Sequence, residues 1–198
     1  MIRNPSNQGD PNGAGISEAE KIALDRVTEL ANIGAGHAAD AFAQMVGTTL
    51  WTSVPTLRTG EPFVSPGACA VSTAGGVFFQ LEGCLDALIG ILFSESTMTH
   101  LARRLMKVEA GPLDPEMAES ALKEVGNILA SHVASAVADT LGERLLPSVP
   151  TLVMQDVEEA FRTFVTEAVG PDCVRIESEL FDPAHTICGR LILVPTRF

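Results

Sequence analysis

The sequence predicts an α+β fold in which one pseudo-two-fold domain is built from two α-β-β-β repeats. Three observations support this fold class. The stretch 25–57 recurs without a gap at 120–152, each copy carries an apolar stripe with the period of a helix, and each half of the chain ends in two strand-like runs. We therefore expect a mainly antiparallel six-stranded sheet with the two long helices packed on one face.

The repeat is clearest in a polar motif. An acidic or hydroxyl residue, a glutamate, an asparagine and a more distant proline keep the same spacing in both copies, with corresponding residues 95 positions apart. The copies are Asp25, Glu29, Asn32 and Pro55, and then Ser120, Glu124, Asn127 and Pro150. Ungapped similarity of this kind indicates a duplicated structural unit. We expect a flexible segment over 1–16 and one domain over 17–198, with repeats at about 17–110 and 112–198.

Each repeat is predicted to begin with a long helix. Ser17 and Glu20 form a capping box before the first helix, Asp114-Pro115 is an N-cap followed by proline at the first helical position, and Gly47 and Gly142 are the predicted stops. The expected buried stripes are Val27, Leu30, Gly34, Ala38, Ala41 and Met45, and then Leu122, Val125, Leu129, Val133, Ala136 and Thr140. At 100° per residue, the first three polar residues of each motif, called the trios below, face away from the core.

Strands and shorter helices fill the rest of each repeat. Extended segments are expected near 50–58 and 145–154, directly after the long helices. Strands are then predicted at 76–81 and 87–93 in the first half and at 173–181 and 186–195 in the second. Short helices are expected at about 95–106 and 156–168. The prolines Pro55 and Pro150 are predicted to set the strand path after each helix.

The composition excludes several classes of protein. A formal charge of −12 argues against nucleic-acid binding, which depends on lysine and arginine neutralising phosphates. The N-terminus lacks the apolar core of a secretory signal, and no apolar stretch approaches the roughly 20 residues of a membrane-spanning helix. The sequence therefore predicts a cytoplasmic protein without membrane insertion. The four cysteines match no zinc motif, so no metal site is predicted and we expect buried, reduced thiols.

The trios are the candidate functional residues. A glutamate and an asparagine three residues apart on a helix lie about 4.5 Å apart along its axis, on nearly the same side. The carboxylate can bind an ammonium group of a partner, and the carboxamide can orient a water molecule. Hydrolysis of a reactive phosphoryl group needs mainly this positioning and electrostatic stabilisation.

The same residues are also compatible with ordinary solvated surface, which is the usual role of a glutamate and an asparagine on an exposed helix face. The duplication changes this balance, because asparagine is a mediocre residue inside helices and yet recurs at the same position. Exposed neighbours have meanwhile diverged, as in Arg26 against Ala121. We expect His37 and His132, which also match, to lie at the flank of each helix and to serve packing or a local hydrogen bond. No other catalytic or cofactor-binding motif is present.

The motif [Asp/Ser]-x3-Glu-x2-Asn-x22-Pro resembles the signature of the CheC, CheX and FliY phosphatases of bacterial chemotaxis. The strings ELANIGAGHAADAF and ALKEVGNILASHVASAVADTLG are also similar to the helices of that family, and the resemblance extends from about residue 17 to the C-terminus. Two intact trios favour the CheC-like members, which resemble this chain most and imply a monomer. FliY-like members add a C-terminal switch domain, for which the sequence after the last predicted strand leaves no room.

The resemblance implies a phosphatase that hydrolyses the aspartyl phosphate of a CheY-type response regulator. Glu29 and Glu124 would engage the active-site lysine of the regulator, and Asn32 and Asn127 would orient the attacking water. Asp25, Ser120, Pro55 and Pro150 complete the motif as supporting residues. The protein would need no cofactor of its own, because the Mg²⁺ belongs to the regulator. CheD, a receptor deamidase, is a second partner implied by the resemblance.

Two alternatives differ from a phosphatase in class. The chain can be a non-catalytic adaptor that binds CheD or the phosphorylated regulator through the trios, in which case loss of both asparagines leaves the regulator's lifetime unchanged. It can also be a structural component of the flagellar motor or a general signalling adaptor, in which case motor proteins rather than a response regulator would be recovered with it.

Overall fold

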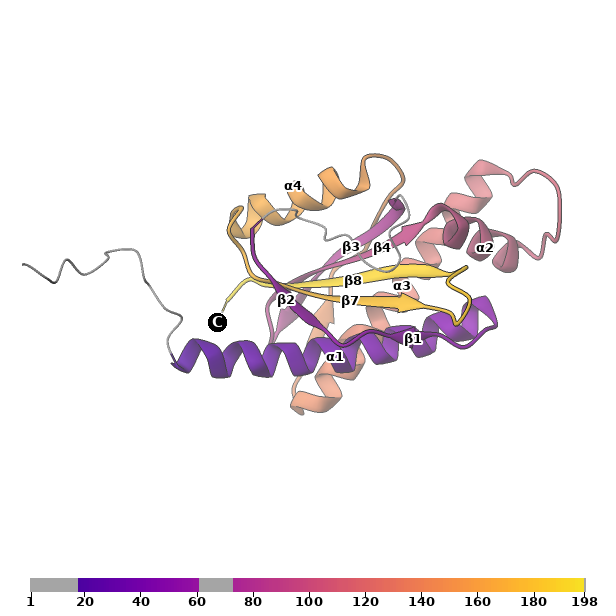
Figure 1. Ribbon diagram of the computed structural model, residues 1–198. Coiled ribbons are helices and arrows are strands. Elements are labelled where there is room, and N and C mark those ends of the chain that lie inside the picture. Colours follow the sequence, from indigo (N-terminus) through magenta and orange to yellow (C-terminus); the bar gives the residue numbers. More distant parts are fainter. Residues whose placement is uncertain (1–17, 61–72, 198) are drawn as a thin grey trace, which may run out of the picture.

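The computed structural model describes residues 18–60 and 73–197, apart from the side chain of Glu20, and forms three layers. An antiparallel sheet lies in the middle. The long helix α1 (Glu18–Val46) packs below it in Figure 1, and α4 (Val157–Val169) packs above it. The second long helix, α3 (Pro115–Leu141), shares a core with α1 on the same face of the sheet. The prediction of an α+β fold with both long helices on one face is confirmed.

The long helices form where the sequence predicts them because their apolar stripes are buried. All predicted stripe residues of α1 are buried except Met45, which is half-buried. In α3 the prediction is wrong only for Thr140, which is exposed, because Val137 occupies the core at the end of the stripe. A Cβ atom at Gly34 would lie 3.4 Å from Cγ1 of Val133. The glycine thus permits close approach of the two helices, whereas a Cβ atom at Gly36 would meet no atom of another segment within 4 Å.

The helix ends follow the capping residues in the sequence. The Asp114 side chain accepts a hydrogen bond from the Met117 backbone N–H at 3.0 Å, with Pro115 at the first helical position. Gly47 and Gly142 both have positive φ, which glycine adopts at low cost, and they end α1 and α3. These predictions are confirmed. The predicted capping box at Ser17 and the segment 1–16 lie outside the described residues.

The sheet has the strand order β1-β7-β8-β4-β3-β5, and every described pair is antiparallel. Two further short strands, β2 and β6, pair with β7 and β3. The strands are β1 (Trp51–Thr52), β2 (Thr56–Arg58), β3 (Thr73–Gly83), β4 (Ala87–Ser94), β5 (Leu145–Pro147), β6 (Thr151–Val153), β7 (Arg175–Phe181) and β8 (Cys188–Pro195).

The number of strands in the described parts of the chain is eight rather than the predicted six. Each extended segment that follows a long helix is divided into two short strands, β1 with β2 and β5 with β6. The interruptions contain Pro55 and Pro150, whose missing N–H groups cannot take part in the ladder. The four longer strands and the two shorter helices agree with the prediction to within a few residues, the helices being α2 (Glu95–Met106) and α4.

The two repeats exchange their edge strands. β1 and β2, which follow the helix of the first repeat, pair with β7 of the second repeat. Likewise β5 and β6, which follow the helix of the second repeat, pair with β3 of the first. Each half of the chain therefore completes the sheet of the other half. This exchange explains why one domain, rather than two independent ones, contains both copies of the motif.

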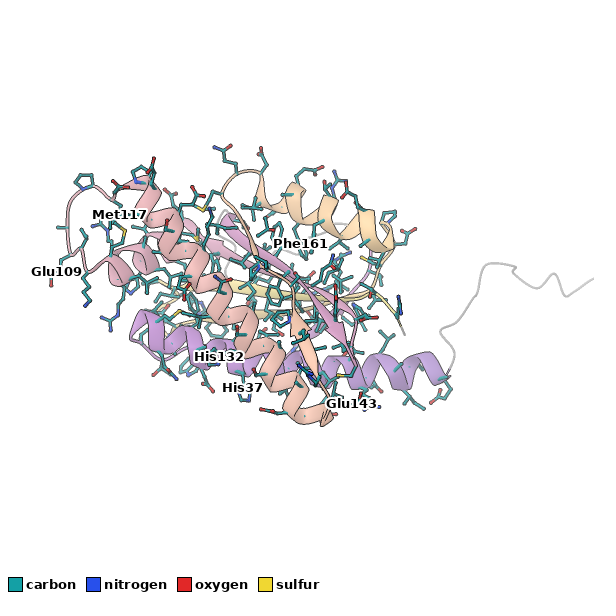
Figure 2. The ribbon with its side chains drawn as sticks, turned by 180° about the vertical axis from the view of Figure 1, so that it is seen from behind. His37, Glu109, Met117, His132, Glu143 and Phe161 are labelled. Atoms are coloured by element: carbon teal, nitrogen blue, oxygen red, sulfur yellow. The ribbon has the colours of Figure 1, made fainter. Side chains whose placement is uncertain are left out.

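The two faces of the sheet bury separate cores. The core shared by α1, α3 and α2 includes Phe42, Phe79 and Leu129. The opposite face is covered by α4, whose Phe161 is fully buried and packs 5.2 Å from the ring of Phe78. Figure 2 shows Phe161 on the side of the sheet that lies away from His37 and His132. Because both faces are covered, β4 is buried along its whole length.

The turn between β7 and β8 is held by a buried carboxylate. One oxygen of Asp182 accepts a hydrogen bond from the Ile187 backbone N–H at 2.7 Å, and the other accepts one from the Thr186 hydroxyl at 2.9 Å. Burial alone would raise the pKa of Asp182, but these hydrogen bonds outweigh it and hold the pKa below its ordinary value.

The change Asp182→Asn is expected to lower the free energy of unfolding by about 1–3 kcal/mol at neutral pH, because a hydrogen-bonded carboxylate is lost from a buried turn. A lowered folded-state pKa stabilises the fold fully above the unfolded pKa of about 4, and this stabilisation disappears as the pH falls through the folded-state value. Urea unfolding at a series of pH values measures the difference between variant and wild type. The difference should shrink in acid, and one that stays constant with pH would contradict this role of the carboxylate.

The cysteines agree only in part with the expectation of buried, reduced thiols, because Cys84 is exposed. Cys84 and Cys173 are free, but Cys188 is disulfide-bonded. The expectation was wrong for Cys188 because a half-cystine is buried as readily as a thiol, so an apolar neighbourhood does not distinguish them. None of the helices in the described parts of the chain has both the length and the apolar character needed to cross a membrane.

Candidate functional site

The first trio lies on the outer face of α1. Asp25, Glu29 and Asn32 are all exposed, while Val27 and Leu30 between them are buried. This alternation follows from the helical period, which places the trio within about 60° of arc opposite the apolar stripe. The sequence prediction that the trio faces away from the core is confirmed.

The second trio has the same setting on α3. Ser120, Glu124 and Asn127 are exposed and the intervening Leu122 and Val125 are buried. The neighbouring Lys123 pairs with Glu119 at 2.7 Å. The backbone carbonyl of Asn127 accepts a hydrogen bond from the hydroxyl of Ser131 at 2.8 Å. The side-chain carboxamide of Asn127 takes no part in this bond.

The glutamate carboxylates and asparagine carboxamides of both trios have no partner among the residues that the structure describes. Among residues 18–60 and 73–197, the side chains of Glu29, Asn32, Glu124 and Asn127 form no hydrogen bond or ion pair with one another or with other residues. Four polar groups are therefore available to a binding partner. Each Glu–Asn pair combines an anion with a group that both donates and accepts hydrogen bonds.

The proline of the motif lies against the helix that carries the second trio. Gly126 immediately precedes Asn127, and a Cβ atom on it would lie 2.9 Å from Cγ1 of Val77 and 3.7 Å from Cβ of Pro150. Glycine thus lets α3 approach the sheet edge closely at the position of the trio. Although 22 residues separate Asn127 from Pro150 in the sequence, the fold brings their segments together.

The segment around each proline is a β-bulge, which the sequence analysis missed. Ser53 pairs with Glu179 and Thr56 with Glu177, so the edge strand advances three residues where β7 advances two. The second copy has the same extra residue: Ser148 pairs with Gln80 and Thr151 with Phe78 of β3. Bulges of this kind redirect side chains at sheet edges and beside functional sites. The repeated string Ser-Val-Pro-Thr-Leu was the available signal.

A serine side chain closes the ladder in each bulge. The Ser53 backbone N–H donates to the Glu179 carbonyl at 3.0 Å, and the Glu179 N–H donates back to the Ser53 hydroxyl at 2.9 Å. The same two bonds join Ser148 and Gln80, at 2.8 and 2.9 Å. In a regular antiparallel pair the second acceptor would be the serine carbonyl. The hydroxyl therefore holds the bulge in one conformation.

The two matched histidines do not have the predicted packing role. His37 and His132 are both exposed, and Figure 2 shows them on the outer sides of α1 and α3. Within the described residues neither imidazole makes a hydrogen bond. The prediction was wrong because a position at the flank of a helix, 120° from the trio, is covered only if a neighbouring element extends over it.

Comparisons with known proteins agree with the motif and the fold. The sequence profile of the CheC-like family matches residues 22–58 and 117–154, which contain both trios and both prolines. A relative from Bacillus subtilis strain 168, the CheY-P phosphatase CheC, is 28% identical over 183 residues, covering 86% of this chain and 84% of the relative.

Solved structures share the fold at lower identity. The crystal structure of Thermotoga maritima FliY has a TM-score of 0.62 at 20% identity, covering 86% of this chain and 87% of that one. The CheX–CheY–BeF3–Mg²⁺ complex from Borrelia burgdorferi contains a chain with a TM-score of 0.59 at 16% identity, covering 83% and 96%. The duplicated motif, its place on two equivalent helices and these similarities agree, and together they support the CheC/CheX/FliY family as the one that this chain resembles.

Proposed function

We propose that the chain is a phosphatase of a phosphorylated CheY-type response regulator and that both trios are its active sites. The main support for the proposal is the two Glu–Asn pairs at equivalent positions of α1 and α3. Their side chains are exposed and have no partner among the described residues. The Bacillus subtilis relative is a CheY-P phosphatase, and the Borrelia burgdorferi CheX was crystallised with CheY, BeF3 and Mg²⁺. Both relatives support a CheY-type partner and a role in chemotaxis.

The chemistry requires little from the phosphatase. An aspartyl phosphate is an activated acyl phosphate, so a positioned water suffices and no strong general base is needed. Glu29 or Glu124 binds the regulator's active-site lysine and fixes the orientation of the complex. Asn32 or Asn127 holds a water in line with the phosphorus. Attack forms a bond from water oxygen to phosphorus, breaks the bond from phosphorus to the aspartate oxygen, and releases inorganic phosphate and the free carboxylate.

The remaining expectations follow from the same proposal. The Mg²⁺ that neutralises the phosphoryl oxygens is supplied by the regulator, and the trios need no metal of their own. The protein acts in the cytoplasm. It acts as a monomer, which the exchanged edge strands support because they complete the sheet within one chain. CheD is the second partner that the resemblance to the family implies.

The proposal separates the roles of glutamate and asparagine, and a binding measurement tests this separation. The probe is a CheY homologue charged with beryllofluoride and Mg²⁺, a stable mimic of the phosphorylated state. The double change Glu29→Gln and Glu124→Gln should weaken its binding about tenfold or more, because each removes one charged contact at the interface. The change of Asn32 and Asn127 to Ala should leave binding within about threefold of wild type, because a water-positioning group contributes mainly to the transition state.

A charge-matched control is available. Glu109 and Glu143 are exposed carboxylates outside the trios, on the α2–α3 loop and just beyond the end of α3 in Figure 2. Changing both to Gln alters the net charge equally and should leave binding unchanged. If the Glu109/Glu143 variant weakened binding as much as the Glu29/Glu124 variant, the loss would reflect long-range electrostatics only. The assignment of Glu29 and Glu124 as direct contacts of the regulator would then be wrong.

A further inference from the structure

The exposed apolar side chains of this protein repeat with the same offset as the trios. Nine large hydrophobic residues are exposed among those described, and six of them form three pairs 95 positions apart. The pairs are Ile22 with Met117, Trp51 with Leu146, and Val54 with Val149. Scattered exposed hydrophobic residues are normal on protein surfaces. A matched set on both halves of the molecule is not scattered and requires an explanation.

Common descent of the halves does not account for two of these pairs, although it can account for the identical Val54 and Val149. These two pairs have changed identity since the duplication, Ile22 against Met117 and Trp51 against Leu146, yet they remain apolar and exposed. Other exposed helix positions changed chemical class over the same interval, as Lys21 against Glu116 illustrates. At these two pairs of positions the residue type has changed, but an apolar side chain has been kept.

One pair lies on the same helix face as the trios. Ile22 and Met117 precede the first residue of each trio by three positions, which places them about 60° from it and on the same side of the helix as the glutamate. Their side chains are 63% and 59% exposed. Figure 2 shows Met117 near the beginning of α3. Each Glu–Asn pair therefore has an apolar residue on its N-terminal side.

A second pair lies on the other side of the trios, at the bulges. Val54 and Val149 lie within the two Ser-Val-Pro bulges and are 82% and 88% exposed, more than any other large hydrophobic residue described. Val149 adjoins Pro150, which lies beside Gly126, the residue before Asn127. The serine hydroxyls hold both bulges in place. Val149 therefore lies next to the asparagine end of the second trio, and the equivalent strand pairing of the first repeat gives Val54 the corresponding place in the first bulge.

We propose that Ile22 with Val54, and Met117 with Val149, are apolar docking contacts for the phosphorylated regulator on either side of each trio. The inference rests on the proposed function and specifies its interface: a charged and polar centre, formed by Glu and Asn, between two apolar contacts roughly 15 Å apart along the helix. The occupant is a receiver domain with uncharged, apolar surface on both sides of its phosphorylated aspartate. Apolar contacts around a polar centre exclude water from the reacting groups.

The kinetics of matched variants test these contacts. The double changes Ile22→Ser with Met117→Ser, and Val54→Ser with Val149→Ser, should each raise the KM for the phosphorylated regulator about tenfold, because one buried apolar contact is lost at each site. The kcat should stay within about twofold, since these side chains bind ground state and transition state alike. All four residues are exposed, so thermal unfolding should be unchanged.

Conservative and remote variants serve as controls. Val54→Ile with Val149→Ile keeps the apolar contact and should retain the KM of wild type. Leu105→Ser removes an exposed leucine of α2 that has no equivalent in the other repeat, and it should have no effect. An unchanged KM in both serine variants, with wild-type binding still dependent on Glu29 and Glu124, would overturn the docking contacts while the proposed function stands.

Two further outcomes would also overturn the inference. If the wild type neither binds nor dephosphorylates any charged regulator, the proposed function and the docking contacts fail together. If the wild type is a dimer in sedimentation and the serine variants are monomers with unchanged KM, the apolar pairs are contacts between copies of this chain instead.

Discussion

Changing Asn32 and Asn127 together to Ala is expected to reduce the acceleration of phosphoryl loss from the regulator about 100-fold or more. The reason is geometric: without the carboxamide, the water is not held in line with the phosphorus, and misplacement by about 1 Å costs a factor of this size. Loss of radiolabelled phosphoryl groups from a CheY homologue charged with acetyl phosphate measures the effect. Each single change should leave the activity of the other site.

The control for this experiment uses equivalent positions further along the same helices. Gln44 and Asp139 lie 95 positions apart, are exposed, and are roughly 18 Å beyond the two asparagines along α1 and α3. Changing both to Ala should leave the activity unaltered. If the asparagine variant folds, binds the regulator and still accelerates dephosphorylation fully, the trios are docking contacts and the chain is an adaptor.

The second large effect concerns the helix on the opposite face of the sheet. Phe161→Ala is expected to lower the free energy of unfolding by about 3–5 kcal/mol, because the ring is fully buried between α4 and the sheet and its loss leaves a cavity. A Cβ atom at Gly90 of β4 would collide with this ring, so β4 has a glycine where Phe161 packs. Chemical denaturation of wild type and variant, with the same m-value for both, measures the change in the free energy of unfolding.

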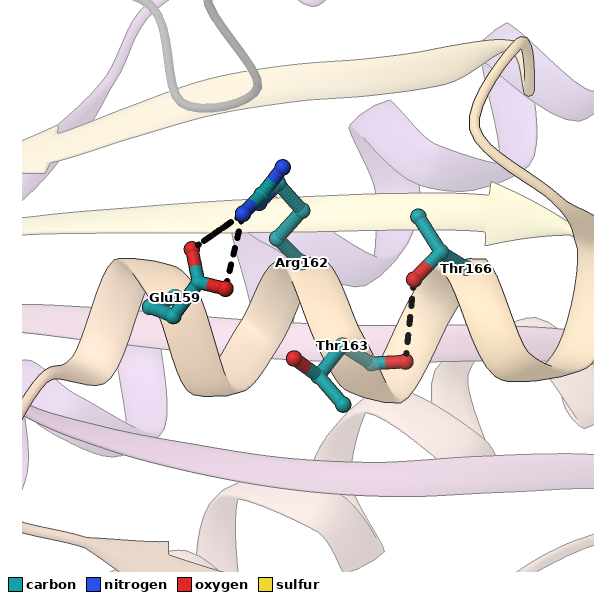
Figure 3. A network of polar contacts seen from close by, with 4 residues as sticks. All are labelled: Glu159, Arg162, Thr163 and Thr166. Atoms are coloured by element: carbon teal, nitrogen blue, oxygen red, sulfur yellow. Dashed lines mark hydrogen bonds and ion pairs between the residues drawn. The ribbon is translucent and has the colours of Figure 1, made fainter.

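The neighbouring Arg162 provides a matched control on the same helix. It is half exposed and pairs with Glu159, as Figure 3 shows. A surface ion pair of this kind contributes about 1 kcal/mol or less, so Arg162→Ala should have a small effect. A loss of less than about 1 kcal/mol for Phe161→Ala would mean that α4 is not anchored to the sheet through this residue.

The helical part of the fold follows directly from the sequence. Burial at every third or fourth residue, the N-cap at Asp114 and the glycine stops all act within one helix, so local patterns determine them. The trios were predictable for the same reason, since residues four and three positions apart share a helix face without any information about the rest of the molecule. Their duplication supplied the functional signal.

The remaining features depend on contacts between distant segments. The bulges require Ser53 to meet Glu179 and Ser148 to meet Gln80, and the exchange of edge strands pairs each repeat with the other. Neither leaves a local signature, because the register of a strand is set by its partner. The exposure of Val54 and Val149 depends on these bulges, and a valine after a helix would otherwise be predicted to enter the sheet.

A turnover experiment shows directly whether the protein catalyses dephosphorylation. A CheY homologue charged with phosphate is mixed with about one-twentieth its amount of this protein, and the remaining phosphoryl groups are followed with time. A phosphatase with two active trios should make the regulator population lose its phosphoryl groups much faster than alone, with many turnovers per molecule of protein and none in the Asn32→Ala, Asn127→Ala variant. A decay identical to that of the regulator alone would contradict the proposed activity.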